Sequence, residues 1–216
     1  TNSLEGYYLT MVYNDFTLET VVKAFQLAVV ETSGLFSDIE PIRPCSHFTT
    51  DLEERVQLAF AVNTHKAKSE FVISYILFEL WVHLDRCPTL FSGTEFNVDP
   101  EKGLTGICDF FISLDPLLFI VGAPVSVFVK VPDISGKDES HTIGLGACVA
   151  EMLAAQRFNK AKGNEIPCIY GATTSGMNWH FLKLEGQRLH IDLALYQIVQ
   201  SDKILGILAS MIQQKA

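Results

Sequence analysis

The sequence lacks the features that mark membrane-spanning and secreted proteins. None of its apolar runs reaches the roughly 20 residues that a transmembrane helix requires. No basic segment followed by an apolar stretch and a cleavage site is visible near its start. We therefore expect a cytoplasmic protein that does not enter a membrane.

The signatures of several common enzyme classes are missing as well. The chain contains no GxSxG, GxxxxGK(S/T), HExxH or HxE…PCxxC pattern. Its five cysteines include no CxxC pair, so we expect buried, reduced thiols rather than a structural zinc site. Serine hydrolase, P-loop NTPase and zinc deaminase activities therefore have no support in the sequence.

Positive charge is scarce. The chain has 16 Lys and Arg against 25 Asp and Glu, which gives a formal net charge of −9. Its densest basic stretch is short, is followed by Glu165, and consists of Arg157, Lys160 and Lys162. Proteins that grip a nucleic-acid backbone usually carry a basic stripe. Nucleic acid therefore stays open as a partner, but we expect any binding to be weak.

Two charged residues stand alone in apolar surroundings. The chain is 48% hydrophobic and 19% charged, as is typical of a well-buried globular protein. Asp109 is the only charged residue between Lys102 and Asp115, and Lys130 is the only one between Asp115 and Asp133. A lone charge in an apolar strand costs free energy unless it is paired or functional. We expect the two to share a site, with Lys130 paired to Asp109 or to an acid from a helix.

The strand that carries Lys130 can be read side chain by side chain, because strand residues alternate between two faces. One face of residues 124–132 is predicted to enter a core and consists of Val125, Val127, Val129 and Val131. The opposite face carries Ser126, Phe128 and Lys130. If Asp109 lies on a neighbouring strand, its carboxylate can reach this second face.

Apolar periodicity divides the chain into a helical part and a sheet part. A helix is predicted over 15–32, and the helical stretch 50–83 is predicted to form two helices, the second of which begins after Asn63, within a helical N-terminal part that spans 15–85. Residues 90–216 are predicted to form the sheet core, with a helix over 144–159 and a closing helix over 200–213. The apolar segment 114–123 either extends a strand or packs as a connection. Strands are predicted at 90–98, 103–113, 124–132, 167–174, 179–184 and 189–193.

This order of elements predicts one domain over residues 1–216. Its fold class is α/β (α+β), with a mixed β-sheet core, helices on both faces, and the two charged strands adjacent near the centre of the sheet.

The order of these elements resembles the pattern of the PD-(D/E)XK nuclease superfamily, which has an acid on one strand, a lysine on the next strand and then a helix. The chain is similar in particular to a group of uncharacterised bacterial proteins that are expected to be restriction-endonuclease-like. The resemblance covers roughly residues 48–208 and rests on an ordered set of segments rather than on one motif. These segments are KAKSEFVISYIL, FSGTEFNVDPEKGLTGICDF, VFVK, GLGACVAEMLAAQRFN and YGATTSGMNWHFLKLEG.

The resemblance implies both a catalytic site and its impairment. In such nucleases two acids hold Mg²⁺ and the lysine orients or activates the attacking water. Asp109, as a metal ligand, and Lys130 fall on the motif positions. Phe128 stands where the related pattern VEAK has Glu, and Ala147 stands where GLGQC has Gln. A phenylalanine cannot bind a hard cation, so we expect its ring to fill the place of the metal and its second carboxylate.

Two further acids are candidates for the same site. Glu70 matches the acid of the family's SEF segment and either approaches the metal or is a solvated acid in the first turn of its helix. Glu151 either faces the site or pairs with a nearby basic side chain. The polar segment 135–141 follows the lysine strand and is either a lid or an ordinary exposed loop.

Three functions are compatible with these observations. The first is a catalytically impaired nuclease fold that acts as a binding or regulatory module. The second is a divergent Mg²⁺-dependent nuclease that uses Asp109 and Lys130 with Glu70 or Glu151 as the substitute acid. The third is a structural or assembly protein unrelated to nucleic acid. A homodimer is compatible with each of them.

Overall fold

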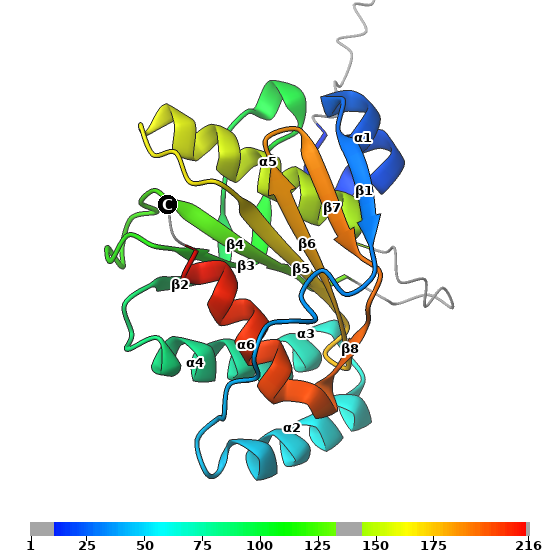
Figure 1. Cartoon of the computed structure of the whole chain (residues 1–216), viewed down its shortest axis with the longest axis vertical. Coiled ribbons are helices and arrows are strands. Elements are labelled where there is room, and N and C mark those ends of the chain that lie inside the picture. Colours follow the sequence, from blue (N-terminus) through cyan, green and yellow to red (C-terminus); the bar gives the residue numbers. More distant parts are fainter. Residues whose placement is uncertain (1–10, 133–143, 215–216) are drawn as a thin grey trace, which may run out of the picture.

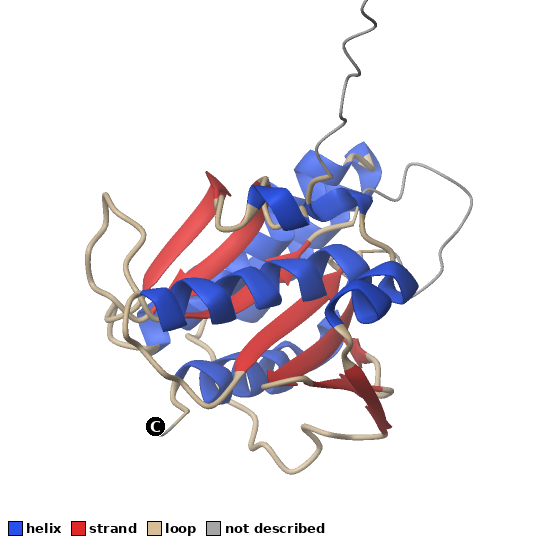
Figure 2. Cartoon of the chain, turned by 90° about the horizontal axis from the view of Figure 1, so that it is seen from above, coloured by secondary structure: helices blue, strands red, loops and turns tan. Residues whose placement is uncertain are grey.

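The chain forms three layers, with a single mixed sheet between two sets of helices (Figures 1 and 2). The structure is a computed structural model that describes residues 11–132 and 144–214. The helical elements are η1 (Tyr13–Asp15), α1 (Leu18–Phe25), α2 (Phe48–Val62), α3 (His65–Ala67), the π-helix η2 (Lys68–Ile73), α4 (Ser74–His83), η3 (Pro100–Lys102), α5 (Leu145–Ala161), η4 (Ile198–Gln200) and α6 (Ser201–Ile212). The strands are β1 (Ala28–Thr32), β2 (Thr89–Glu95), β3 (Ile107–Ser113), β4 (Val125–Lys130), β5 (Ile169–Thr174), β6 (Asn178–Glu185), β7 (Arg188–Asp192) and β8 (Tyr196–Gln197).

The strand order is β1-β7-β6-β5-β4-β3-β2, and β8 pairs with β6. The β1–β7 and β4–β5 pairs are parallel, whereas the other pairs are antiparallel. The helix α5 connects β4 to β5, because parallel neighbours need a long crossover. The predicted mixed sheet is therefore confirmed, and the strands of Asp109 and Lys130 are adjacent within it.

Each face of the sheet buries its own apolar cluster. On one face, α2, η2, α4 and α6 cover a cluster that includes Val127 and Val129 of β4. On the other, α5, α1 and η1 cover a cluster that includes Phe111 and Phe128. The strand β4 is buried along its whole length, because helices cover both of its faces. This arrangement confirms the predicted helices on both sides of the sheet.

The predicted helix over 15–32 is wrong in its second half. The helix α1 ends at Gln26, whose φ of 54° is left-handed, and residues 28–32 form the edge strand β1. This strand runs parallel to β7, from Ala28 opposite Arg188 to Thr32 opposite Asp192. Consequently the strand predicted at 90–98, which corresponds to β2, is the second strand along the chain and not the first. The N-terminal part is therefore not purely helical. The β-branched Val-Val-Glu-Thr run is compatible with a strand, but only the distant partner β7 selects that state.

One side chain of β4 faces the other way from its prediction. Val125 belongs to the cluster under α5 and not to the cluster of Val127 and Val129. The register between β3 and β4 shifts at Ile112 and Ser113, so the simple alternation is interrupted there. Asn159 of α5 also holds this end of the strand, because its side chain bonds both the N–H and the carbonyl of Val125 at 2.8 Å.

The connection between β3 and β4 is an exposed loop rather than a strand extension or a packed segment. Ser113 and Asp115 fix its base, through hydrogen bonds to the Gly122 carbonyl and from the Leu117 N–H. Its apolar tip is exposed and consists of Leu117, Leu118, Phe119 and Ile120.

The cysteines match their prediction only in part. Cys108, Cys148 and Cys168 are buried thiols, but Cys45 and Cys87 are exposed. Within residues 11–132 and 144–214, no helix is long and apolar enough to cross a membrane.

Candidate functional site

Asp109 and Lys130 meet where β3 and β4 run side by side. The pairs Phe110–Val129 and Phe111–Phe128 set the antiparallel register, which leaves Asp109 opposite Lys130. The Lys130 Nζ lies 3.2 Å from the Asp109 Oδ2, which also accepts a 2.9 Å hydrogen bond from the N–H of Val131. The structure therefore confirms the predicted pairing of the two lone charges.

The helix α5 brings a second carboxylate to the same ammonium group. The Glu151 Oε1 lies 3.2 Å from the Lys130 Nζ, and the Glu151 side chain is 0% exposed. Near the start of α5, Gly146 lets the helix pack closely on another segment, because a Cβ at this position would lie 2.3 Å from the carbonyl oxygen of Phe16. The first turns of α5 are thus held tightly against the segment before α1. Glu151 faces the site and pairs with Lys130, so the two alternatives stated for it are fulfilled together.

Solvent reaches this cluster mainly from the side of Asp109. The side chain of Asp109 is 21% exposed, compared with 6% for Lys130 and none for Glu151. A buried ion pair is retained only where its charges satisfy each other, because desolvation of each ion is costly. The Lys130 ammonium, bound by two carboxylates, meets that condition.

The surroundings shift the pKa values of both buried partners. Burial by itself disfavours the charged form of Lys130, but the carboxylates of Glu151 and Asp109 outweigh it and raise the pKa of the lysine. Burial raises the pKa of Glu151 to about 7, against the opposing effect of Lys130. Lys130 therefore stays charged at neutral pH, whereas Glu151 takes up a proton more readily than an ordinary glutamate.

Two thiols border the cluster and are not activated. Burial raises the pKa of both Cys108 and Cys148 above the ordinary thiol value, and the negative charge of Glu151 adds to the effect. Neutral thiols are weak nucleophiles and weak metal ligands, so the cluster offers no cysteine chemistry.

Phe128 fills an apolar part of the same face. Its ring is fully buried and packs against Phe96 and Phe111, with centroid distances of 5.8 and 5.7 Å. The side chain therefore belongs to an aromatic cluster beneath α5, beside Lys130. Mg²⁺ requires hard oxygen ligands, and at this position the site offers only carbon.

The arrangement does not suit the Mg²⁺ ion that the sequence resemblance implies. Lys130 already occupies the space between the two carboxylates as their shared ion-pair partner, and Phe128 supplies no third ligand. Across the part of the chain that the structure describes, no group of three His, Cys, Asp or Glu side chains is arranged to hold a metal.

Glu70 is not brought to this cluster. Its side chain is 52% exposed and pairs with Lys66, one turn earlier, at 2.8 Å. The segment 135–141, considered as a lid, lies outside the described residues.

Sequence reasoning missed a contact from the helical N-terminal part. The Nε2 of His65, at the start of α3, lies 2.7 Å from the carbonyl oxygen of Val131. No spacing in the sequence links these two residues. The contact ties the helical layer to the end of β4, directly after Lys130.

Comparisons with protein families, with curated proteins and with solved structures find no match for this chain. The chemistry of this site is therefore inferred from the geometry of the Asp109–Lys130–Glu151 cluster.

Proposed function

We propose that this chain is a PD-(D/E)XK-like nuclease fold that has lost phosphodiester hydrolysis and acts as a binding or regulatory module. One observation carries the proposal. The ammonium group of Lys130 lies 3.2 Å from each of the two carboxylates, Asp109 and Glu151. In this arrangement the lysine is the counter-ion that a divalent metal would otherwise be.

Burial supports this view of Lys130. A lysine that positions an attacking water must offer its ammonium group to that water. Here the ammonium is almost fully buried and already has two carboxylate partners. Removal of Lys130 would leave the fully buried Glu151 carboxylate without a counter-ion, which is strongly unfavourable. The cluster is thus suited to hold α5 against β3 and β4 rather than to turn over a substrate.

A simple back-mutation at position 128 does not test the proposal. Phe128→Glu would place a carboxylate inside the aromatic cluster that Phe128 forms with Phe96 and Phe111. An unpaired charge at such a site costs several kcal/mol, so loss of folding would precede any gain of metal binding.

The direct test measures metal binding and cleavage on the unaltered protein. Isothermal titration with Mn²⁺ and Mg²⁺ is expected to show no saturable site. Incubation with supercoiled plasmid, single-stranded DNA and RNA in the presence of either metal is expected to leave all three intact. Metal-dependent cleavage that Asp109→Asn abolishes, and that the exposed control Lys162→Gln retains, would refute the proposal.

A second function has one observation in its favour. A divergent Mg²⁺-dependent nuclease needs a substitute acid near Asp109 and Lys130, and Glu151 lies there. For this activity the metal would have to displace Lys130 from both carboxylates. Cleavage that is lost in both Asp109→Asn and Glu151→Gln, but kept in Glu70→Gln, would establish this alternative.

A further inference from the structure

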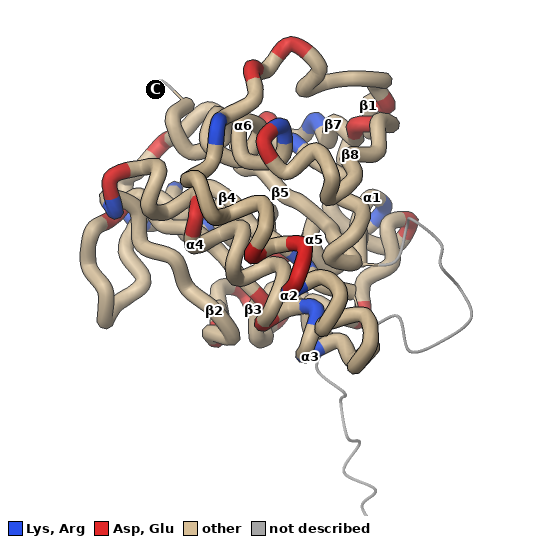
Figure 3. Tube along the Cα trace, turned by 90° about the horizontal axis from the view of Figure 1, so that it is seen from below, with Lys and Arg blue, Asp and Glu red and all other residues tan. Residues whose placement is uncertain are grey.

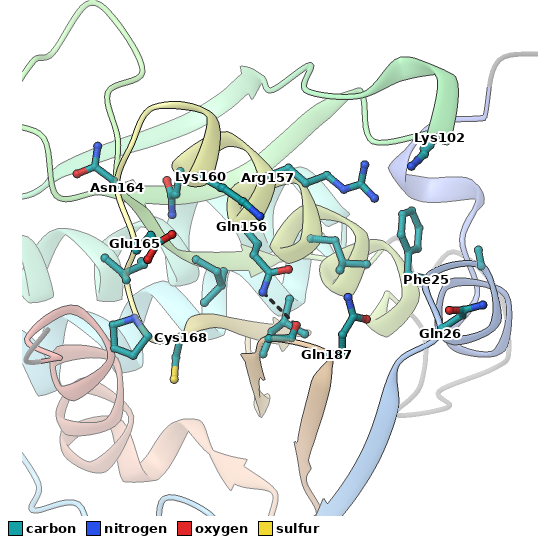
Figure 4. Close-up of a pocket in the computed structure, with 18 residues that line it drawn as sticks. Phe25, Gln26, Lys102, Gln156, Arg157, Lys160, Asn164, Glu165, Cys168 and Gln187 are labelled. Atoms are coloured by element: carbon teal, nitrogen blue, oxygen red, sulfur yellow. Dashed lines mark hydrogen bonds between the residues drawn. The ribbon is translucent and has the colours of Figure 1, made fainter.

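A cavity lies outside the charged cluster, along the second half of α5. Its volume is about 750 Å³, within the usual range for small-molecule sites. Five separate segments line it: the end of α1, η3, α5 itself, the segment leading into β5, and the turn between β6 and β7 (Figure 4). A cavity built from five segments of the folded chain is shaped before any ligand arrives.

The cavity combines an apolar floor with a positively charged rim. Buried side chains of Leu153, Ile169 and Leu184 contribute to its floor. The cationic residues of its lining are Lys102, Arg157 and Lys160, and its one carboxylate is Glu165. This local excess of positive charge stands out in a chain whose net charge is −9.

Arg157 and Phe25 form one end of the cavity. The guanidinium group of Arg157 bonds Asp99 at 2.5 Å, and its carbon lies 5.4 Å from the centroid of the Phe25 ring. The ion pair holds the guanidinium group over the Phe25 ring, and the two groups make a cation–π contact. The end of α1 thus offers an aromatic side chain next to a guanidinium group.

The two lysines on the rim are free to meet a ligand. Neither Lys102 nor Lys160 forms an ion pair with any of the residues described in the structure, and both are exposed. An anion bound here would gain the attraction of both groups without having to break an existing pair. Long-range attraction to a rim of this kind also raises the rate of encounter with anions.

Amide groups complete the polar surface of the cavity. Gln156 donates a 3.0 Å hydrogen bond to the Gly186 carbonyl, which ties α5 to the β6–β7 turn (Figure 4). Gln26, Gln187 and Asn164 also line the cavity. Side-chain amides can donate to and accept from the edges of a heterocycle.

We propose that this cavity binds a nucleoside monophosphate group, with the phosphate held by Lys102, Arg157 and Lys160 and the flat base over the apolar floor near Phe25. The class follows from the lining, which pairs a cationic rim with apolar and amide surfaces that suit a base. The group has two sources, a free nucleotide or the 5′-phosphorylated end of a strand. The proposal does not depend on the function assigned to the Asp109–Lys130–Glu151 cluster.

Titration with AMP tests the site. Saturable binding is expected by calorimetry, with shifts of the side-chain amide resonances of Gln156 and Gln187 in NMR spectra. Adenosine and inorganic phosphate should each bind much more weakly than AMP, because each lacks one half of the recognised group. Absence of saturable AMP binding, or equal affinity for adenosine, would overturn the proposal.

Charge reversals locate the binding. Lys102→Glu and Lys160→Glu should each weaken AMP binding about fivefold to tenfold at low salt. The matched control is Lys162→Glu, which reverses an exposed charge two residues away and outside the lining, and it should change the affinity less than about twofold. Equal losses in Lys160→Glu and Lys162→Glu would refute the assignment. Thermal unfolding of all three variants confirms that the fold is kept.

Two short oligonucleotides then distinguish the sources of the ligand. Hexathymidylate with a 5′-phosphate is compared with the same strand carrying a 5′-hydroxyl. Phosphate-dependent binding of the oligonucleotide, weakened by Lys160→Glu, supports the cavity and identifies a strand end as the source. Binding of AMP without binding of the phosphorylated strand supports the cavity and identifies a free nucleotide.

Discussion

Replacement of Lys130 by methionine is the perturbation that most directly probes the charged cluster. Methionine keeps most of the volume and removes the ammonium group that lies 3.2 Å from both Asp109 and Glu151. The Glu151 carboxylate, which is fully buried, then loses its counter-ion. Removal of one partner from a buried ion pair typically costs about 3–5 kcal/mol, and we expect a loss of that size in the free energy of unfolding at pH 8.

The loss should depend on pH, because Glu151 can escape its charge by taking up a proton. Burial already raises its pKa to about 7 from the ordinary 4.5. A carboxyl group with a raised pKa contributes stability below its unfolded-state value, and that contribution is lost as pH rises through the folded-state value. Without Lys130 the pKa rises further. Well below pH 7 the folded wild type and the folded variant both hold this proton, so the destabilisation of Lys130→Met should change little from pH 5 to pH 6 and grow from about pH 7 to pH 8, at up to about 1.4 kcal/mol per pH unit.

Urea unfolding of wild type and variant at pH 5, 6, 7 and 8 measures this difference. A double variant, Lys130→Met with Glu151→Leu, replaces the buried pair by apolar groups and should recover most of the loss. Lys183→Met removes a lysine from a surface pair with Glu185 and should cost less than about 1 kcal/mol. Equal stability of Lys130→Met and wild type at pH 8, or no recovery in the double variant, would contradict the reasoning.

Three further outcomes follow from contacts elsewhere in the molecule. Phe128→Ala should lower the free energy of unfolding by about 3–5 kcal/mol, because it leaves a cavity beside Phe96 and Phe111; a loss below about 1 kcal/mol in urea unfolding would show that the ring is not packed. Asn159→Ala should cost about 2–3 kcal/mol, because it leaves both polar groups of Val125 buried and unpaired; Asn164→Ala, at a part-exposed position just after α5, is the matched control and should be nearly neutral. The dissociation constant for duplex DNA at physiological salt should exceed about 10⁻⁴ M in a mobility-shift titration. The reason is that acidic residues outnumber basic ones and gather on α2 among other elements (Figure 3). A micromolar dissociation constant would contradict this.

The central part of the fold was predictable because its signals are local. Single charges at Asp109 and Lys130 interrupt long apolar runs, and the strand periodicity around them predicts one shared face. Adjacent strands then bring the two side chains together, as the structure confirms. For Glu151 the sequence left two alternatives, because helical spacing does not specify how a helix is rotated over a sheet.

The parts that could not be predicted depend on contacts between distant segments. No sequence signal near Ala28 indicates that this residue pairs with Arg188. The apolar periodicity of α1 also continues into the residues of β1. Glu70 looked like a site residue because of its place in a sequence pattern, but its carboxylate pairs with Lys66. The cavity along α5 could not be predicted either, because its walls come from five segments that only the folded chain brings together.

The parallel pairing of β1 with β7 has a consequence for the order of assembly. Most of the chain lies between these two strands, and a ribosome releases the N-terminal strand long before its partner. The edge strand must therefore wait for its partner until residues 188–192 have been synthesised. Contacts of such long sequence separation are slow to form because a large loop has to close first. Truncation before residue 188 should leave β1 without its only strand partner in the described structure, with its backbone groups open to pairing with other chains.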